Sequence, residues 1–256
     1  MRWWNWLLIG MMAYGLEIGV SIPPEKSIVK AIGGKKVSVK VILPKGATPV
    51  TYSPTLSQIA EIGKVPLFFS IGVPFEKKFI PLLKRNGVTV VDLGELVNRR
   101  QVKGIKDPHI WLSPPMLIAE GAVVVRELIK RDPTNRNYYL QNYRKFVERL
   151  LELNRVGYTL IGKSFITFHP AYGYFAETYG ITQIPIENSE GGSSIALLER
   201  IVELGRKQKA KVVFIAPEYP KRFAEKVAQQ LGAKVVVVSP LDDPFLTLKK
   251  VMEGLK

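Results

Sequence analysis

The chain contains two histidines, and the segments around them favour metal-ion binding. His109 lies in the segment D-P-H-I-W and His169 in the segment F-H-P. In each segment a neighbouring proline restricts the backbone, which suits a side chain whose ring must keep one orientation. Neutral imidazole is the commonest protein ligand for transition metals. For either histidine alone, a partly buried or surface position without a ligand is the alternative interpretation.

Two imidazoles do not complete a metal site, so further ligands must come from other residues. Structural zinc sites use four protein ligands, and catalytic zinc sites use three and a water molecule. The chain has no cysteine, which excludes thiolate ligands, disulfides and cysteine nucleophiles. Carboxylates that follow expected strands are the remaining candidates, and their spacing does not choose among them: Glu187, Glu190, Asp242 and Asp243.

Sequence motifs of the common enzyme classes are absent. The chain has no H-E-x-x-H, no Walker A or dinucleotide-binding glycine pattern, and no G-x-S-x-G. We therefore expect a binding protein that is not an enzyme. A metal-dependent hydrolase with two histidines and one carboxylate is the enzymatic alternative.

The composition is that of a globular protein with a strong positive charge. The 256 residues include 37 Lys and Arg against 22 Asp and Glu, a net charge of +15, and suffice for one large domain or two smaller ones. Basic clusters at residues 99–106 and 206–211 lack the interleaved aromatic residues of a nucleic-acid interface. We expect solvated faces there, with attraction to anionic lipid surfaces as the alternative, and no nucleic-acid partner.

The N-terminal residues 1–15 have the layout of a secretory signal. Arg2 is their only charge, an apolar run follows, and Ala13 and Gly15 are small residues at the −3 and −1 positions of a cleavage site. The run is shorter than the roughly 20 apolar residues of a membrane span. We expect a periplasmic or otherwise extracytoplasmic protein, with an uncleaved membrane anchor or a buried first strand as alternatives.

Strand and helix signals alternate in two parts of the chain, separated by a stretch without strand signals. Residues 114–154 form that stretch; an Asp-Pro pair at 132–133 interrupts it, and apolar residues then recur at the spacing of a long helix. The alternation on either side predicts parallel or mixed sheets covered by helices. Strands are expected at residues 16–22, 37–43, 67–71, 88–93, 165–168, 181–186, 212–215 and 235–238, and helices at residues 23–34, 56–62, 75–86, 171–179, 195–208, 220–231 and 245–255.

The predicted fold class is α/β, with two lobes that each contain a central parallel-type sheet and are joined by a long backbone helix. Ligands of such folds bind at the carboxyl ends of strands. His169 and Ser239 each follow an expected strand, and His109 lies in a loop before the linking helix, so all three are expected to face a cleft between the lobes. The expected boundaries are residues 1–15 for the signal or anchor, 16–113 for the N-terminal lobe, 114–154 for the linking helix and 155–256 for the C-terminal lobe.

Motifs spread in a consistent order from about Ile18 to the C-terminus carry a resemblance to one known family. They are the opening I-G-V-S-I-P-P at 18–24 with I-G-G at 32–34, the segment 37–54, D-P-H-I-W-L-S-P at 107–114, D-P at 132–133, F-H-P-A-Y-G-Y-F at 168–175 and P-L at 240–241. The chain resembles the metal-binding solute-binding proteins of ABC transporters, the zinc, manganese and iron class with the TroA-like fold.

This resemblance implies a divalent metal ion in the cleft between two lobes and a membrane permease as partner. Of the family's usual four ligands, His109 and His169 match. Val50 stands where the family commonly has histidine, and Ser239 where it commonly has aspartate. The His-rich and acid-rich loop of some zinc-binding members is missing, because the segment 95–106 is short and basic.

The first hypothesis is therefore an extracytoplasmic, monomeric receptor that binds zinc or manganese and delivers it to the permease. Asp242, Asp243 or Glu190 would then supply the missing ligands. Val50 and Ser239 make the cleft less ionic than in the family pattern, so the alternative is the same scaffold binding another solute, a chelated metal or a partner protein.

Overall fold

The computed structural model describes residues 15–187, 194–219 and 221–256. Residues 1–14 of the expected signal segment and the candidate ligand Glu190 lie outside these ranges. Among the residues that are described, no helix is both long enough and apolar enough to span a membrane.

The N-terminal half contains a parallel four-stranded sheet with the strand order β2-β1-β3-β4. All four residues of β3 are buried, which is typical of a parallel strand covered on both faces. The strands are β1 (Leu16–Val20), β2 (Val37–Val41), β3 (Leu67–Ser70) and β4 (Thr89–Asp92), and the helices between them are α1 (Pro23–Gly33), α2 (Leu56–Ile62) and α3 (Ile80–Arg85).

The helix expected at residues 75–86 is divided in two. A 3₁₀ segment, η2 (Pro74–Lys78), precedes α3, which begins only at Ile80. Pro81 explains the division, because a proline is tolerated in the first turn of a helix but not in its interior.

The C-terminal half contains a second parallel sheet, with the order β10-β9-β7-β8. Numbered within each half, both sheets have the order 2-1-3-4, so the halves share a topology that no repeat in the sequence indicates. The strands are β7 (Ser164–Thr167), β8 (Thr182–Pro185), β9 (Val212–Ile215) and β10 (Lys234–Val237), and the helices are α6 (Gly173–Tyr179), α7 (Ser194–Lys207), α8 (Lys221–Leu231) and α9 (Pro244–Leu255).

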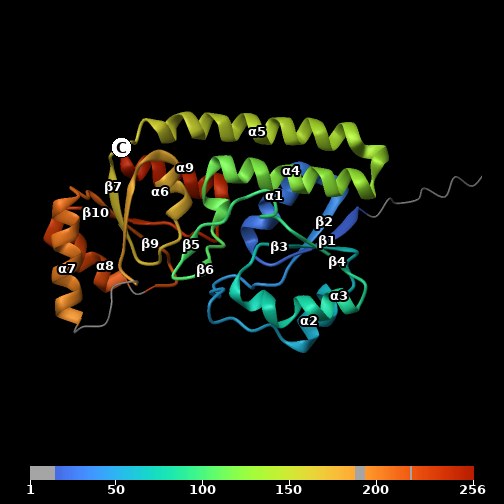
Figure 1. Cartoon of the computed structure of the whole chain (residues 1–256), viewed down its shortest axis with the longest axis horizontal. Coiled ribbons are helices and arrows are strands. Elements are labelled where there is room, and N and C mark those ends of the chain that lie inside the picture. The colour runs from blue at the N-terminus through green and yellow to red at the C-terminus, as the bar shows by residue number, and fades with distance from the viewer. Residues whose placement is uncertain (1–14, 188–193, 220) are drawn as a thin grey trace, which may run out of the picture.

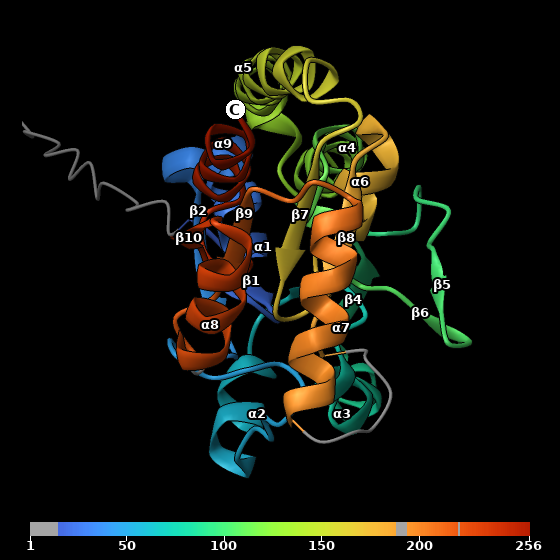
Figure 2. The ribbon, with the colours of Figure 1, turned by 90° about the vertical axis from the view of Figure 1, so that its left-hand side faces the viewer.

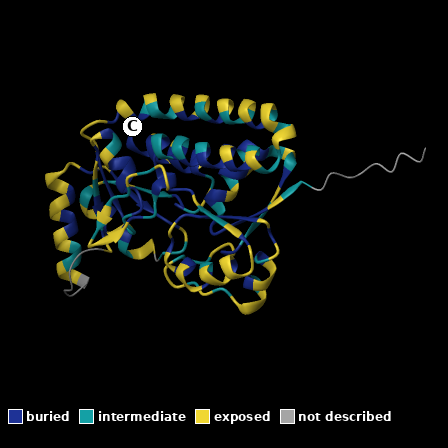
Figure 3. Cartoon of the chain, turned by 45° about the vertical axis from the view of Figure 1, so that its right-hand side comes forward, coloured by how far each residue is buried: buried dark blue, intermediate teal, exposed yellow. Residues whose placement is uncertain are grey.

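Two packed helices connect the sheets, and the break between them lies at the Asp-Pro pair expected to interrupt the linking stretch 114–154. α4 (Pro114–Arg131) and α5 (Arg136–Tyr158) are separated by a short 3₁₀ turn, η4 (Pro133–Asn135). α5 runs along both halves (Figure 1), with its outer side exposed and its inner side covered (Figure 3). α1 packs against α4 and α5, and α9 packs against α5, so the pair supports both halves from one side.

A short hairpin of β5 (Gln101–Val102) and β6 (Ile105–Lys106) projects from the side of the molecule (Figure 2). Lys103 and Gly104 form its turn with φ of 50° and 75°, the left-handed values that a two-residue hairpin turn requires. The sequence does not indicate this hairpin, because its strands have two residues each and Lys-Gly is not the usual Asn-Gly or Asp-Gly signal.

Candidate metal centre

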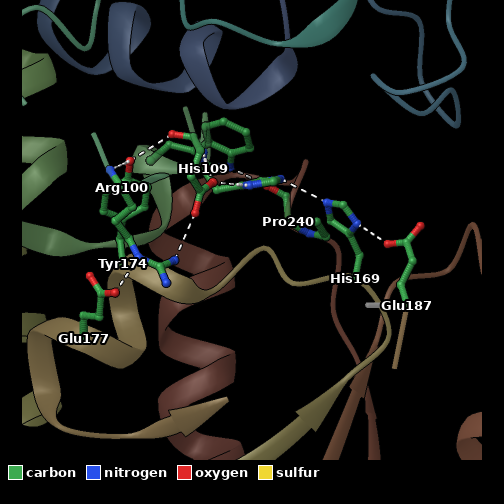
Figure 4. Close-up of polar contacts among 9 residues, drawn as sticks. Arg100, His109, His169, Tyr174, Glu177, Glu187 and Pro240 are labelled. Atoms are coloured by element: carbon green, nitrogen blue, oxygen red, sulfur yellow. Dashed lines mark hydrogen bonds and ion pairs between the residues drawn. The ribbon is translucent and has the colours of Figure 1, made fainter. Parts of the chain in front are cut away.

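The two histidines meet between the halves of the molecule, 60 residues apart in the chain. Nε2 of His109 lies 3.2 Å from Nε2 of His169, with the two imidazole rings at 64° to each other (Figure 4). Their side chains are 16% and 21% exposed, so both rings are largely shielded from solvent. Of the three residues expected to face one cleft, both histidines line the same cavity, whereas Ser239 lines an adjoining one.

A carboxylate stands behind each imidazole ring. Oδ1 of Asp107 lies 2.7 Å from Nδ1 of His109 and also accepts the backbone N–H of His109 at 3.0 Å. Glu187 contacts Nδ1 of His169 through Oε2. A carboxylate on Nδ1 favours the tautomer with its proton there, which leaves the Nε2 lone pair free. This carboxylate–imidazole pairing is the usual support for histidines that bind metals.

Burial and neighbouring charges set the protonation of these groups. Burial, followed by repulsion from a protonated His109, lowers the pKa of His169, and the opposing effect of Glu187 is smaller. Burial alone would raise the pKa of Asp107, but its hydrogen bond to His109 and the attraction of that ring outweigh this effect and lower it. Near neutral pH, therefore, His169 is neutral and Asp107 is ionised, the states in which they would support a cation.

Local structure fixes each histidine. His109 directly precedes a 3₁₀ turn, η3 (Ile110–Leu112), in which Trp111 is 1% exposed and donates from Nε1 to the carbonyl of Pro240 at 2.7 Å. His169 follows β7, and its carbonyl accepts the hydroxyl of Thr167 at 2.9 Å. The first contact ties the His109 segment to the C-terminal half.

The two imidazoles line one wall of a cavity of about 200 Å³. The other walls come from loops that follow strands β2, β3, β9 and β10, so the carboxyl ends of both sheets surround it. In sheets of this order, the position between strands 1 and 3 is where ligands bind. Most of the remaining lining is apolar: Pro49, Val50, Val73, Pro74, Pro108, Trp111, Pro240 and Leu241, with Thr48, Glu218 and the hydroxyl-bearing Tyr219 as the polar additions.

The other residues singled out in the sequence occupy different places. Val50 lines the cavity with the histidines and is 61% exposed. Ser239, Asp242 and Asp243 instead line an adjoining cavity. Ser239 is 6% exposed and its hydroxyl accepts the N–H of Leu241 at 3.1 Å. Asp243 caps α9 by accepting the N–H groups of its first turn.

Sequence reasoning missed three side chains at the site. Asp107 was read only as part of the D-P-H-I-W motif. Glu218 and Tyr219, which follow β9, were not singled out, although their place after a strand is a signal of the kind used for Glu187.

Within residues 15–187, 194–219 and 221–256, no group of three His, Cys, Asp or Glu side chains is arranged to hold a metal ion.

The chain is similar to known metal-binding proteins. The chain matches the family model described as "Zinc-uptake complex component A periplasmic" over residues 18–247. It is 25% identical to the high-affinity zinc uptake system protein ZnuA of Bacillus subtilis, over 89% of this chain and 79% of that protein. It is 24% identical to the manganese-binding lipoprotein MntA of Halalkalibacterium halodurans, over 86% of this chain and 77% of that protein.

Solved structures show the same fold. A crystal structure of a ZnuA deletion mutant with zinc bound has a TM-score of 0.84 and 30% identity, over 94% of this chain and 96% of the other. A crystal structure of ZnuA has a TM-score of 0.83 and 29% identity, over 94% and 100% of the two chains. The expected resemblance, α/β fold and non-enzymatic class are confirmed. The chain belongs to the ZnuA family of metal-binding solute-binding proteins of ABC transporters.

Proposed function

We propose that this chain is the extracytoplasmic component of an ABC transporter that captures a divalent metal ion between His109 and His169. The observation that carries the proposal is the 3.2 Å approach of the two Nε2 atoms. Each ring has a carboxylate at Nδ1, so two lone pairs face each other at this distance. Two lone pairs this close repel each other, and a cation between them would instead form a coordinate bond with each.

The spacing favours zinc as the metal that is carried. Zinc–imidazole bonds are about 2.0–2.1 Å long, so two nitrogens 3.2 Å apart subtend about 100–106° at the ion, close to a tetrahedral angle. Manganese sites prefer oxygen ligands. Zinc is therefore the first candidate and manganese the second.

The carboxylates behind the rings balance the charge of the ion. Asp107 is ionised at neutral pH, and Glu187 contacts the other ring. Two carboxylates offset the double positive charge of the metal ion, which two neutral imidazoles alone would leave unbalanced. This supports metal binding even though the protein as a whole carries a charge of +15.

We further propose that residues 1–15 direct export and that the mature chain acts as a monomer that delivers its ion to a membrane permease, without a nucleic-acid partner. The family description as a periplasmic component supports the location. Cell fractionation with N-terminal sequencing tests it: a mature chain that begins near Leu16 in the extracytoplasmic fraction is expected. Size-exclusion chromatography with light scattering tests the monomer.

Titration calorimetry tests the metal site. Wild type is expected to bind zinc more tightly than manganese, and His109→Ala and His169→Ala are each expected to weaken zinc binding by about 100-fold, because each removes one of two donors. Asp242→Asn is the matched control, since Asp242 lines the adjoining cavity. Equal zinc affinity for wild type and both alanine variants would contradict the proposal.

A further inference from the structure

The metal centre has fewer donors than a zinc ion takes. Zinc in proteins is nearly always four-coordinate, and His109 and His169 supply two donors. In the part of the chain that the structure describes, no third His, Cys, Asp or Glu joins them in a metal-holding group. At least two coordination positions are therefore left for something other than these side chains.

The space in front of the histidines is large and mainly apolar. The cavity measures about 200 Å³, many times the roughly 10–15 Å³ that one water needs. Val50, Val73 and Leu241 are among its walls, and side chains of this kind form no hydrogen bonds. Waters in front of the metal could hydrogen-bond to one another but not to these walls, so an apolar group against the walls is favoured over water.

The carboxylates already at the site limit the charge of any co-ligand that could replace water on the metal. Asp107 and Glu187 stand behind the two rings and together offset a dication. Glu218 adds a third carboxylate on the cavity wall. A polyanionic co-ligand would be repelled, whereas a neutral or singly charged one would be accepted.

We infer that this site takes its metal as a complex with a small bidentate chelator, neutral or singly anionic, whose apolar body fills the cavity beside Val50. The two imidazoles bind one side of the ion and the chelator binds the other. The inference rests on the proposed metal binding and adds the chemical form in which the ion is captured.

Equilibrium dialysis with picolinate and isonicotinate tests the inference. Both are singly charged pyridine carboxylates of the same size, but only picolinate can chelate. With zinc present, picolinate is expected to be retained at one per protein and to raise the apparent zinc affinity about tenfold or more, equivalent to about 1.4 kcal/mol. Isonicotinate is expected to do neither. A chelator that only competes for zinc would lower the amount of bound zinc, which would overturn the inference.

Three variants separate the inference from the proposed function. Val50→Phe enlarges a residue that is 61% exposed at the cavity, so the fold is retained; it is expected to bind zinc alone as wild type does but to lose the picolinate effect. Nanomolar binding of zinc alone that is lost in Glu218→Gln or Glu190→Gln would overturn the inference, because the chain would then complete the site itself, and the proposed function would stand. Absence of zinc binding with and without picolinate would refute both.

Discussion

Arg100 donates from Nη1 to Oδ2 of Asp107 at 3.0 Å, while Oδ1 of the same carboxylate contacts His109 (Figure 4). The Nε of Arg100 donates to Glu177 of α6 at 2.6 Å. Tyr174, also on α6, accepts the backbone N–H of Arg100 and donates its hydroxyl to the carbonyl of Asp107, each at 2.9 Å. The base of the projecting hairpin is thus linked to a proposed metal ligand and to the C-terminal half.

Arg100→Gln is expected to weaken zinc binding by about threefold to tenfold. Replacing groups that hydrogen-bond directly to metal ligands typically reduces metal affinity about 10–100-fold, and Arg100 acts one step further away, through Asp107. Calorimetry at neutral pH measures the change. Arg126→Gln is the matched control, because Arg126 pairs with Glu95 and Glu127 instead, and it should bind zinc as wild type does. If Arg100→Gln binds zinc with wild-type affinity, Arg100 anchors the hairpin but does not contribute to metal binding.

Val50→His is expected to tighten binding of zinc alone by about 10–100-fold. The new imidazole would add a third nitrogen donor at the cavity that His109 and His169 already line, and three protein ligands with one open position is a common zinc arrangement. Val50→Phe is the control, since it adds a ring of similar size without a donor. The picolinate effect should also shrink in Val50→His, because fewer coordination positions remain. Unchanged zinc affinity would mean that position 50 does not reach the ion.

Much of the fold could be predicted from hydrophobic periodicity and from proline and glycine positions. β9 and α2 have the bounds that their patterns indicate, and most other elements differ by one or two residues at their ends. The Asp-Pro pair at 132–133 indicates where the stretch 114–154 is interrupted, and Asp132 stabilises the turn there by accepting hydrogen bonds from Thr134 and Asn135. The packing of α4 against α5 depends on contacts between residues far apart in the chain, which periodicity does not encode.

The two proposed metal ligands could be predicted from the sequence, but the carboxylates that contact their rings could not. His109 and His169 stand in recognisable motifs, whereas the pairing of Glu187 with His169 depends on a side-chain orientation that spacing does not encode. The role of Asp243 could have been read from the sequence, since an aspartate followed by proline is a typical start of a helix. Its carboxylate accepts N–H groups of α9, which leaves less of it available to a metal.

Trp111→Phe is expected to lower the free energy of unfolding by about 2–4 kcal/mol. The substitution removes the hydrogen bond from Nε1 to the Pro240 carbonyl and leaves a space in the core where Trp111 is 1% exposed. Urea denaturation followed by circular dichroism measures the loss. Tyr138→Phe is the control, because the hydroxyl of Tyr138 accepts only a long, exposed hydrogen bond from Lys35, and it should change stability by less than about 0.5 kcal/mol. Equal losses in the two variants would contradict a special role of the Trp111–Pro240 contact.

Asp132→Asn is expected to destabilise the protein in a pH-dependent way. Burial alone would raise the pKa of Asp132, but hydrogen bonds, above all from the hydroxyls of Tyr139 and Thr134, outweigh it and hold the pKa below its ordinary value of 3.8. A carboxylate whose pKa is lower in the folded state stabilises the fold above the unfolded pKa, and the stabilisation is lost as the pH falls through the folded pKa.

Wild type should therefore exceed Asp132→Asn in unfolding free energy by about 1–2 kcal/mol at pH 7, and the difference should shrink as the pH falls below about 3.8. Urea denaturation at pH 7, 5 and 3 measures it, with Glu253→Gln as the control, because Glu253 makes only an exposed ion pair with Lys249 at 4.0 Å. A difference that is the same at all three pH values would show that the geometry of the turn between α4 and α5, and not the charge of Asp132, provides the stabilisation.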